Sequence, residues 1–153
     1  GFGPPPRIHG HRPRVQVGSV CLGRGTPQEP GDVRSDNPAL ITPAGRLHLS
    51  LPDWARVQRL FLDGAGLLDR ATLERLLDLP ADGRGMSMGW ADASRIAGVG
   101  LAMQGSNTSW AATAMMTPDR RRAALVVAND GRTSVLRASA RLAAELATDQ
   151  STT

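Results

Sequence analysis

Hydrophobic residues follow no regular period over the first 45 residues of the chain. This segment holds most of the eleven prolines and many of the glycines, and its apolar pieces, such as Val15-Gln16-Val17, are long enough only for brief strands. A structureless stretch of this length is uncommon inside a compact domain. We therefore expect residues 1–45 to form an extended lead-in that lies on another surface.

A helical pattern begins at Ser50. The run Ser50-Leu51-Pro52-Asp53 combines a capping residue with Pro and an acidic residue in the first turn, which favours a helix start. An apolar stripe at helical spacing follows, consisting of Trp54, Val57, Leu60 and Phe61. Gly64 and Gly66 end this pattern, so the first predicted helix stops before them.

A second helix is predicted to start at Asp69 and to end before Pro80. Its expected buried residues are Leu73, Leu76 and Leu77. Residues 46–80 are therefore interpreted as a helical segment.

The remaining pattern indicates strands and a closing helix. Strand-like runs occur at 86–91, 108–116 and 123–128, with a further short run from Gly98 to Met103. Thr117-Pro118-Asp119 is a short turn, which makes the last two runs an antiparallel hairpin. A helix is expected over 132–148 and should turn four apolar residues inward: Val135, Leu136, Leu142 and Leu146. The prediction is a mixed α/β (α+β) fold in which antiparallel strands carry a C-terminal helix.

Composition narrows the possible chemistry. The 153 residues suit one domain, and 41% hydrophobic with 21% charged residues fits a globular chain. No apolar run reaches the roughly 20 residues that a membrane-spanning helix needs. All 18 basic residues are Arg, and the chain contains neither Lys nor Tyr, so a P-loop Lys, a Lys general base and a Tyr acid are excluded. The segment Gly1–Pro6 has neither an initiator Met nor a signal-peptide pattern, and we expect the chain to be cut from a longer protein.

The net charge of +4 does not by itself indicate a nucleic-acid partner. The arginines are scattered, the cluster Arg120-Arg121-Arg122 fits a solvated hairpin tip, and three Trp with two Phe leave little for base stacking. We therefore expect no nucleic-acid partner.

The sequence offers only weak candidates for a metal site or a reactive cysteine. The lone Cys21 cannot form an intramolecular disulfide, and an inert thiol is expected. His9 and His11 lack a third ligand nearby and are interpreted as a loop pair, while His48 is expected to be half-buried. We expect neither a metal nor a cofactor.

The run Gln104-Gly105-Ser106-Asn107, placed between two strands, is the strongest candidate for chemistry. Gly allows close approach of a ligand, Ser and Asn offer small polar groups, and a strand edge can direct backbone N–H groups at a developing oxyanion. The same tripeptide Gly-Ser-Asn is also an ordinary tight turn. Both interpretations remain open on the residues alone.

Several pieces in order resemble the serine β-lactamase and penicillin-binding-protein superfamily, in the branch of class C-like β-lactamases, D-Ala-D-Ala carboxypeptidases and related esterases. The pieces are Gly1–Pro5 with Gly10-His11, 36–40 with 45–54, Met88-Gly89-Trp90, Gly105–Thr108 with the strand around Trp110, and 125–129. The similarity covers roughly residues 1–147 and implies that residues 1–153 are the C-terminal portion of a larger β-lactamase-like domain.

This resemblance implies a serine hydrolase that acts on an ester, amide or β-lactam through an acyl-enzyme. The family's Ser-x-x-Lys pair would lie upstream, so no catalytic residue is expected in this chain. The expected substrate-side and oxyanion-side strand is Met103, Gln104, Gly105, Ser106 and Asn107, with the Ser106 N–H as second oxyanion donor. Met103 stands where the family has Lys or His, which implies that the intact protein either prefers neutral esters over anionic β-lactams or lacks activity.

The implied partners are the N-terminal remainder of the same domain and, in the intact protein, a small-molecule or peptidoglycan-like substrate. The chain alone is expected to be inactive. A non-catalytic binding or structural module with the same fold is the alternative, and the pattern does not decide between a cytoplasmic and an exported protein.

Overall fold

A computed structural model describes residues 10–17, 20–29, 32, 36–81 and 85–149. The chain divides into two compact units. Unit 1 comprises residues 1–50, 104–113 and 126–139, and unit 2 comprises residues 51–103, 114–125 and 140–153. Gly1–Pro6 and His9, which the sequence analysis singled out, lie outside the described residues.

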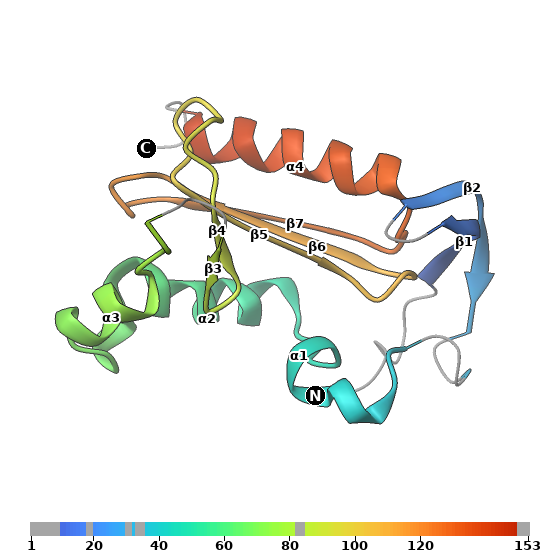
Figure 1. Ribbon diagram of the computed structural model, residues 1–153, viewed down its shortest axis with the longest axis horizontal. Helices are drawn as coiled ribbons and strands as arrows, with labels where there is room; N and C mark the ends of the chain where they lie inside the picture. Colours follow the sequence, from blue (N-terminus) through green and yellow to red (C-terminus); the bar gives the residue numbers. More distant parts are fainter. Residues whose placement is uncertain (1–9, 18–19, 30–31, 33–35, 82–84, 150–153) are drawn as a thin grey trace. The chain divides into compact units, whose positions relative to one another are not determined.

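The N-terminal segment forms a two-stranded antiparallel sheet. Strand β1 (Gly10–Val17) pairs with β2 (Val20–Gln28), from Gly10 opposite Gln28 to Val17 opposite Val20, with an irregularity between Pro13 and Val15. Figure 1 shows this ribbon in blue. These strands are longer than the brief pieces expected from the sequence. Pro and Gly disfavour a helix in this segment, and pairing in a hairpin satisfies its backbone N–H and C=O groups instead.

The helices predicted to start at Ser50 and Asp69 are present, but the expectation of an extended lead-in up to residue 45 is wrong for residues 39–45, which are helical. A single 3-10 turn, η2 (Ala39–Ile41), leads into the short helix α1 (Thr42–Gly45). Helix α2 (Leu51–Asp63) is followed by the turn η3 (Gly64–Gly66) and by α3 (Arg70–Leu76). The side chain of Asp69 caps α3 by accepting a hydrogen bond of 2.7 Å from the Thr72 N–H, as its position in the sequence predicts.

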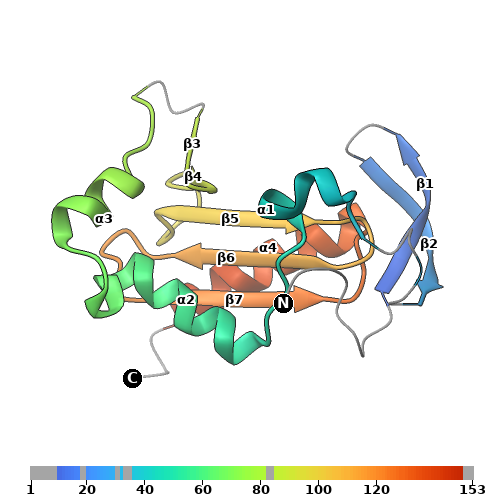
Figure 2. The ribbon, with the colours of Figure 1, turned by 90° about the horizontal axis from the view of Figure 1, so that it is seen from below.

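A five-stranded antiparallel sheet follows, in the order β3-β4-β5-β6-β7. Its strands are β3 (Met86–Ser87), β4 (Trp90–Asp92), β5 (Leu101–Ser106), β6 (Ala111–Met116) and β7 (Ala123–Ala128). Figure 2 shows β5, β6 and β7 side by side, with β7 outermost. The α+β class and the helix on the sheet are therefore confirmed.

The predicted strand 86–91 is wrong in one respect, because it is a tight hairpin rather than one strand. Met86 pairs with Ala91 and Ser87 with Trp90. The two turn residues Met88 and Gly89 have φ of 48° and 88°. Positive φ at both central residues is the geometry that two-residue hairpins require, so the chain reverses there.

The core of unit 2 is built on Trp90, Ala114 and Met116, which are fully buried. The rings of Phe61 and Trp90 meet edge to face, with centroids 5.6 Å apart. The surrounding apolar side chains come from α2 and the sheet and include Trp54, Leu62, Leu101, Met103 and Leu125. The stripe predicted on α2 therefore does face a hydrophobic core.

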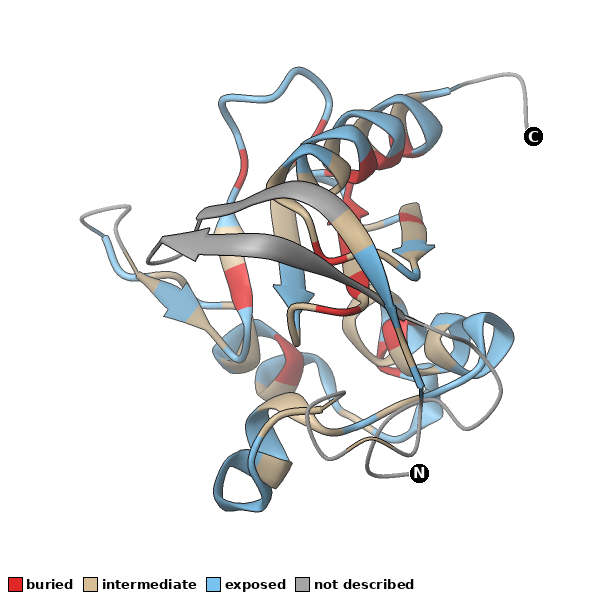
Figure 3. Ribbon diagram, turned by 90° about the vertical axis from the view of Figure 1, so that its right-hand side faces the viewer, coloured by how far each residue is buried: buried red, intermediate tan, exposed pale blue. Residues whose placement is uncertain are grey.

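The closing helix α4 (Thr133–Thr148) lies on the sheet, and the inward face predicted for it is right only in part (Figures 1 and 3). Val135 and Leu136 are half-buried. Leu142 and Leu146 are 46% and 51% exposed, so their predicted inward position is wrong. The buried residues are Ser139, Ala143 and Ala147, spaced four apart. Small side chains at this spacing let the helix backbone approach the sheet closely, which bulky leucines would prevent.

Candidate functional site

The predicted site residues lie on β5 and just after it. Side chains on a strand alternate between the two faces of a sheet, so Met103 and Gln104 point to opposite faces. The register pairs β4 with Leu101 and Ala102 of β5. The end of β5, from Gln104 to Ser106, is exposed.

Met103 belongs to the hydrophobic core rather than to an open polar site. Its side chain is half-buried and packs against the cluster of Trp90, Ala114 and Met116. An apolar thioether in this place neither carries charge nor donates a proton. The position that resembles the family's Lys or His is therefore filled by a packing residue.

Gln104 is held by two hydrogen bonds on the other face of the strand. Its Nε2 donates to Thr113 Oγ1 at 2.8 Å and to the Leu136 carbonyl oxygen at 3.0 Å. These bonds link β5 to β6 and to the first turns of α4. Gln104 thus has a structural role at the end of the strand.

Gly105 and Ser106 form the exposed tip of β5. A Cβ added at Gly105 would meet nothing within 4 Å, so the space beside this residue is open. The Ser106 Oγ accepts a hydrogen bond of 2.9 Å from the Thr108 N–H. Such a bond stabilises a turn, and it does not activate the hydroxyl as a nucleophile.

Asn107 organises the turn that connects β5 to β6. Its Oδ1 accepts hydrogen bonds from the Ser109 N–H at 3.2 Å and from the Trp110 N–H at 3.0 Å. Thr108 has a φ of 75°, in the left-handed region that non-glycine residues seldom adopt. The tight-turn interpretation of Gly-Ser-Asn is therefore confirmed for the side chains, and strand β6 starts at Ala111 rather than at the predicted Thr108.

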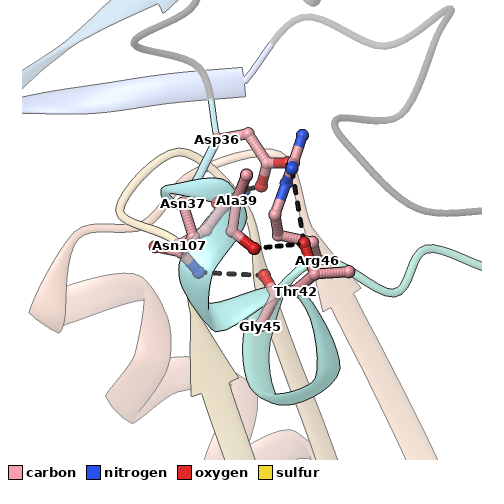
Figure 4. Close-up of polar contacts among 7 residues, drawn as sticks. All are labelled: Asp36, Asn37, Ala39, Thr42, Gly45, Arg46 and Asn107. Atoms are coloured by element: carbon pink, nitrogen blue, oxygen red, sulfur yellow. Dashed lines mark hydrogen bonds and ion pairs between the residues drawn. The ribbon is translucent and has the colours of Figure 1, made fainter.

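A buried carboxylate holds this turn from a distant part of the sequence (Figure 4). Asp36 Oδ1 accepts a hydrogen bond of 3.2 Å from Asn107 Nδ2, and Asp36 Oδ2 forms an ion pair of 2.7 Å with Arg46 Nε. The Asp36 side chain is only 6% exposed. We call Asp36, Arg46 and Asn107 the carboxylate clamp.

The electrostatics of the clamp favour the ionised carboxylate. Burial alone would raise the pKa of Asp36, but the hydrogen bond from Arg46 opposes it, as do those from the Asn37 backbone and from Asn107. The net effect lowers the pKa of Asp36 below its ordinary value. Asp36 therefore stays charged at neutral pH and keeps both partners in place.

A second support for the clamp lies beside it. Asn37 Nδ2 donates a hydrogen bond of 2.9 Å to the Gly45 carbonyl oxygen, which closes the segment around α1 (Figure 4). Thr42 Oγ1 donates to the Ala39 carbonyl oxygen at 2.7 Å. The segment 36–46 is thus folded onto itself and presents Asp36 at a fixed place.

Sequence reasoning missed the clamp because its partners are 71 positions apart. The run Asp36-Asn37-Pro38 contributed to the family resemblance, yet no local spacing connects it with Asn107. The only signal for the clamp in the sequence was the presence of acidic, amide and basic residues in short polar segments next to strand ends.

The other candidates take part in no site among the described residues. His48 is half-buried, as predicted. In the part of the chain that the structure describes, no three His, Cys, Asp or Glu residues lie close enough together to hold a metal ion. Nothing is described of the side chains of His11 and Cys21, and no helix among the described residues is long and apolar enough to cross a membrane.

Comparison with known proteins adds no identification: no protein family, no curated protein and no solved structure matches this chain significantly. The site must therefore be interpreted from its own geometry.

Proposed function

We propose that this chain is the C-terminal part of a β-lactamase-like serine hydrolase, which forms an acyl-enzyme on an ester, amide or β-lactam and releases it with water. In this proposal the chain supplies the strand beside the oxyanion and a preceding segment supplies the nucleophile. The proposal rests on the resemblance of the sequence pieces, on the order of strands and closing helix, and on the geometry at the end of β5.

One observation carries the proposal: the tip of β5 is exposed, and hydrogen bonds hold the turn that follows it. An oxyanion hole needs a backbone N–H that is fixed before the reaction, with space in front of it for the substrate carbonyl. Beside Gly105 the Cβ side is open, because a Cβ placed there would meet no atom within 4 Å other than those of Gly105 and its chain neighbours. The turn that follows is fixed by Asn107 and by the carboxylate clamp. The Ser106 N–H is the expected donor.

The residues of the strand take distinct roles in this proposal. Asn107 holds the turn rather than contacting the substrate, since both atoms of its amide are bonded within the protein. Met103 offers no cation to a substrate carboxylate, and a charge-assisted hydrogen bond is roughly twice as strong as a neutral one. The intact enzyme is therefore proposed to prefer neutral esters over anionic β-lactams.

The experiment that tests this function begins with the polypeptide encoded upstream of Gly1. The family's Ser-x-x-Lys pair cannot come from a chain without Lys, and the resemblance implies that it lies in a preceding segment. We expect a longer protein to contain that pair and to be labelled on its Ser by a fluorescent ester-mimicking phosphonate. A preceding sequence without the pair, or a longer protein that resists labelling, overturns the proposal.

A non-catalytic binding or structural module is the second candidate, and a specific observation favours it. Met103 packs in the core, and the Ser106 and Asn107 side chains are engaged in the turn. These three residues therefore serve packing and turn formation. Ligand binding by the longer protein without turnover would support this alternative over the hydrolase.

A further inference from the structure

Residues 36–46, which we call the strap, bury little of themselves although they hold the buried carboxylate of the clamp. The strap contains η2 and α1, and neither element has a buried residue. Its two largest apolar side chains, Leu40 and Ile41, are 92% and 42% exposed. A segment with few buried apolar contacts opens locally at a lower free energy than the core of a domain does.

The strap is closed by polar bonds between its own residues. Asn37 Nδ2 donates to the Gly45 carbonyl oxygen at 2.9 Å, and Arg46 Nε pairs with Asp36 Oδ2 at 2.7 Å (Figure 4). Both bonds join the beginning of the strap to its end. Because they lie within the strap, it can leave the rest of unit 1 without losing them, and it can therefore move as one body.

The bond of 3.2 Å from Asn107 Nδ2 to Asp36 Oδ1 connects the strap to the β5–β6 turn. An Asn side chain has a donor end and an acceptor end of nearly the same shape, so a half-turn of the amide exchanges them. A carboxylate only accepts, and it therefore selects the orientation that points Nδ2 at the strap. The same orientation points Oδ1 at the Ser109 and Trp110 N–H groups, which donate to it.

Departure of the strap therefore has a consequence for the turn. Without Asp36 beside it, the Asn107 amide can turn over, and its Nδ2 offers no acceptor to the two N–H groups. Thr108 lies in the same turn with a φ of 75°, a conformation that persists only where surrounding bonds hold it. The turn should loosen, and Ser106 directly precedes it.

We propose that the strap opens as a unit while the five-stranded sheet and α4 stay folded, and that its opening releases the β5–β6 turn beside the Ser106 N–H. A ligand that binds only the docked strap would then order the turn, because it shifts the equilibrium toward the docked state. This inference does not rest on the proposed hydrolase, since the opening is a property of this chain without a substrate. A longer protein that resists labelling would leave it standing.

Amide hydrogen exchange of the whole chain, followed by NMR at pH 7, measures the opening residue by residue. The reporters are the Ile41 and Arg46 N–H groups of the strap and the Ser109 and Trp110 N–H groups of the turn, all of which donate hydrogen bonds. We expect these four amides to be at least about tenfold less protected than those of β6 and α4. Their exchange should depend little on urea, because a local opening exposes little surface. Four reporters as protected as the β6 amides would mean that strap and turn open only with the whole domain, which overturns the proposal.

Asp36→Asn tests whether the carboxylate holds the strap and orients Asn107. Its loss should accelerate exchange at the strap and turn reporters together, by about tenfold to a hundredfold, because hydrogen bonds to a charged group are among the stronger ones. The control is Asp92→Asn, which removes an acceptor of the Ser94 N–H in unit 2 and should leave all four reporters unchanged. Acceleration of the strap reporters alone, or no more acceleration than in the control, overturns the proposal.

Asn107→Asp separates the strap from the turn. The new carboxylate repels Asp36, so the strap reporters should exchange faster. It still accepts hydrogen bonds from the Ser109 and Trp110 N–H groups, so these two should stay protected. Slower exchange in the strap, or turn reporters that accelerate as much as in Asp36→Asn, would show that the amide orientation of Asn107 does not link strap and turn.

Discussion

Gly131 shows how closely the residues around the β5–β6 turn are packed. It is buried, and a Cβ added to it would overlap the carbonyl group and Cα of Thr108. Thr108 itself has a positive φ, so the turn has little freedom to move away. Gly131 is therefore required by the close approach of two backbone segments.

We expect Gly131→Ala to lower the free energy of unfolding by about 1–3 kcal/mol, because the new methyl group must displace the Thr108 backbone. Urea denaturation followed by circular dichroism measures this loss. Gly105→Ala is the matched control, since its Cβ would enter open space, and we expect a change within about 0.5 kcal/mol. A Gly131→Ala variant as stable as the control would contradict the packing described for this turn.

Asp36 makes the stability of the clamp depend on pH. Its pKa in the folded chain is lowered by its partners, so the carboxylate stabilises the fold above its unfolded pKa of about 3.9. That contribution is lost as the pH falls through the lower folded-state pKa. Asp36→Asn should cost about 1.5–3 kcal/mol at pH 7, and the difference from the native chain should shrink below about pH 4.

Urea denaturation of both chains between pH 7 and pH 2.5 checks this expectation. The control is Asp53→Asn, which breaks an ion pair with Arg56 whose two side chains are largely exposed, and should change stability by less than about 1 kcal/mol. A difference between Asp36→Asn and the native chain that stays constant down to the lowest pH would show that the charge of Asp36 does not matter.

Only those features of the candidate site that depend on neighbouring residues in the sequence were predictable. Gln104 to Asn107 were placed at a strand end because glycine and small polar residues interrupt an apolar run, and the structure has them there. The packing of Met103 and the contact of Asn107 with Asp36 were not predictable, because both depend on residues that folding brings together from far along the chain.

At the scale of whole elements, the second half of α4 is where sequence reasoning failed, whereas Val135 and Leu136 in its first half are half-buried. Both the leucines and the alanines of α4 form a stripe along the helix. Hydrophobicity alone predicts that the stripe with the larger side chains, the leucines, is buried. Space against the sheet favours the smaller ones, and Ala143 and Ala147 are buried while Leu142 and Leu146 are exposed. Helix starts were predicted better, because the residues that favour them, Pro52 for α2 and Asp69 for α3, act on the backbone of the first helical turn alone.

Two substitutions distinguish the two orientations of α4. We expect Ala143→Leu to cost about 1–3 kcal/mol, since the position is fully buried against the sheet. Leu142→Ala, on the exposed side, should change the free energy of unfolding by less than about 1 kcal/mol. Chemical denaturation measures both, and the reverse order of the two losses would mean that the leucine stripe faces inward.

At the scale of the whole molecule, the chain combines a folded sheet with a candidate site whose one serine at the end of β5 is engaged in a turn. Its composition excludes a Lys base, and the one serine at the tip of β5 accepts a hydrogen bond from a backbone N–H. A serine becomes nucleophilic when a base removes its proton, which a backbone N–H cannot do. Under the hydrolase proposal, the fold and the chemistry therefore reside in different parts of the polypeptide.

We accordingly expect the isolated chain to show no burst with nitrophenyl acetate and no labelling by a fluorescent penicillin. Stopped-flow absorbance and gel fluorescence measure the two, with chymotrypsin and a known penicillin-binding protein as positive controls. Ser106→Ala should behave as the native chain does, since the hydroxyl only stabilises the turn. A stoichiometric adduct on Ser106, seen by mass spectrometry and absent from Ser106→Ala, would show that the chain carries its own nucleophile. In that case the tip of β5 would be the reacting centre itself, and no preceding segment would be needed for the acylation step.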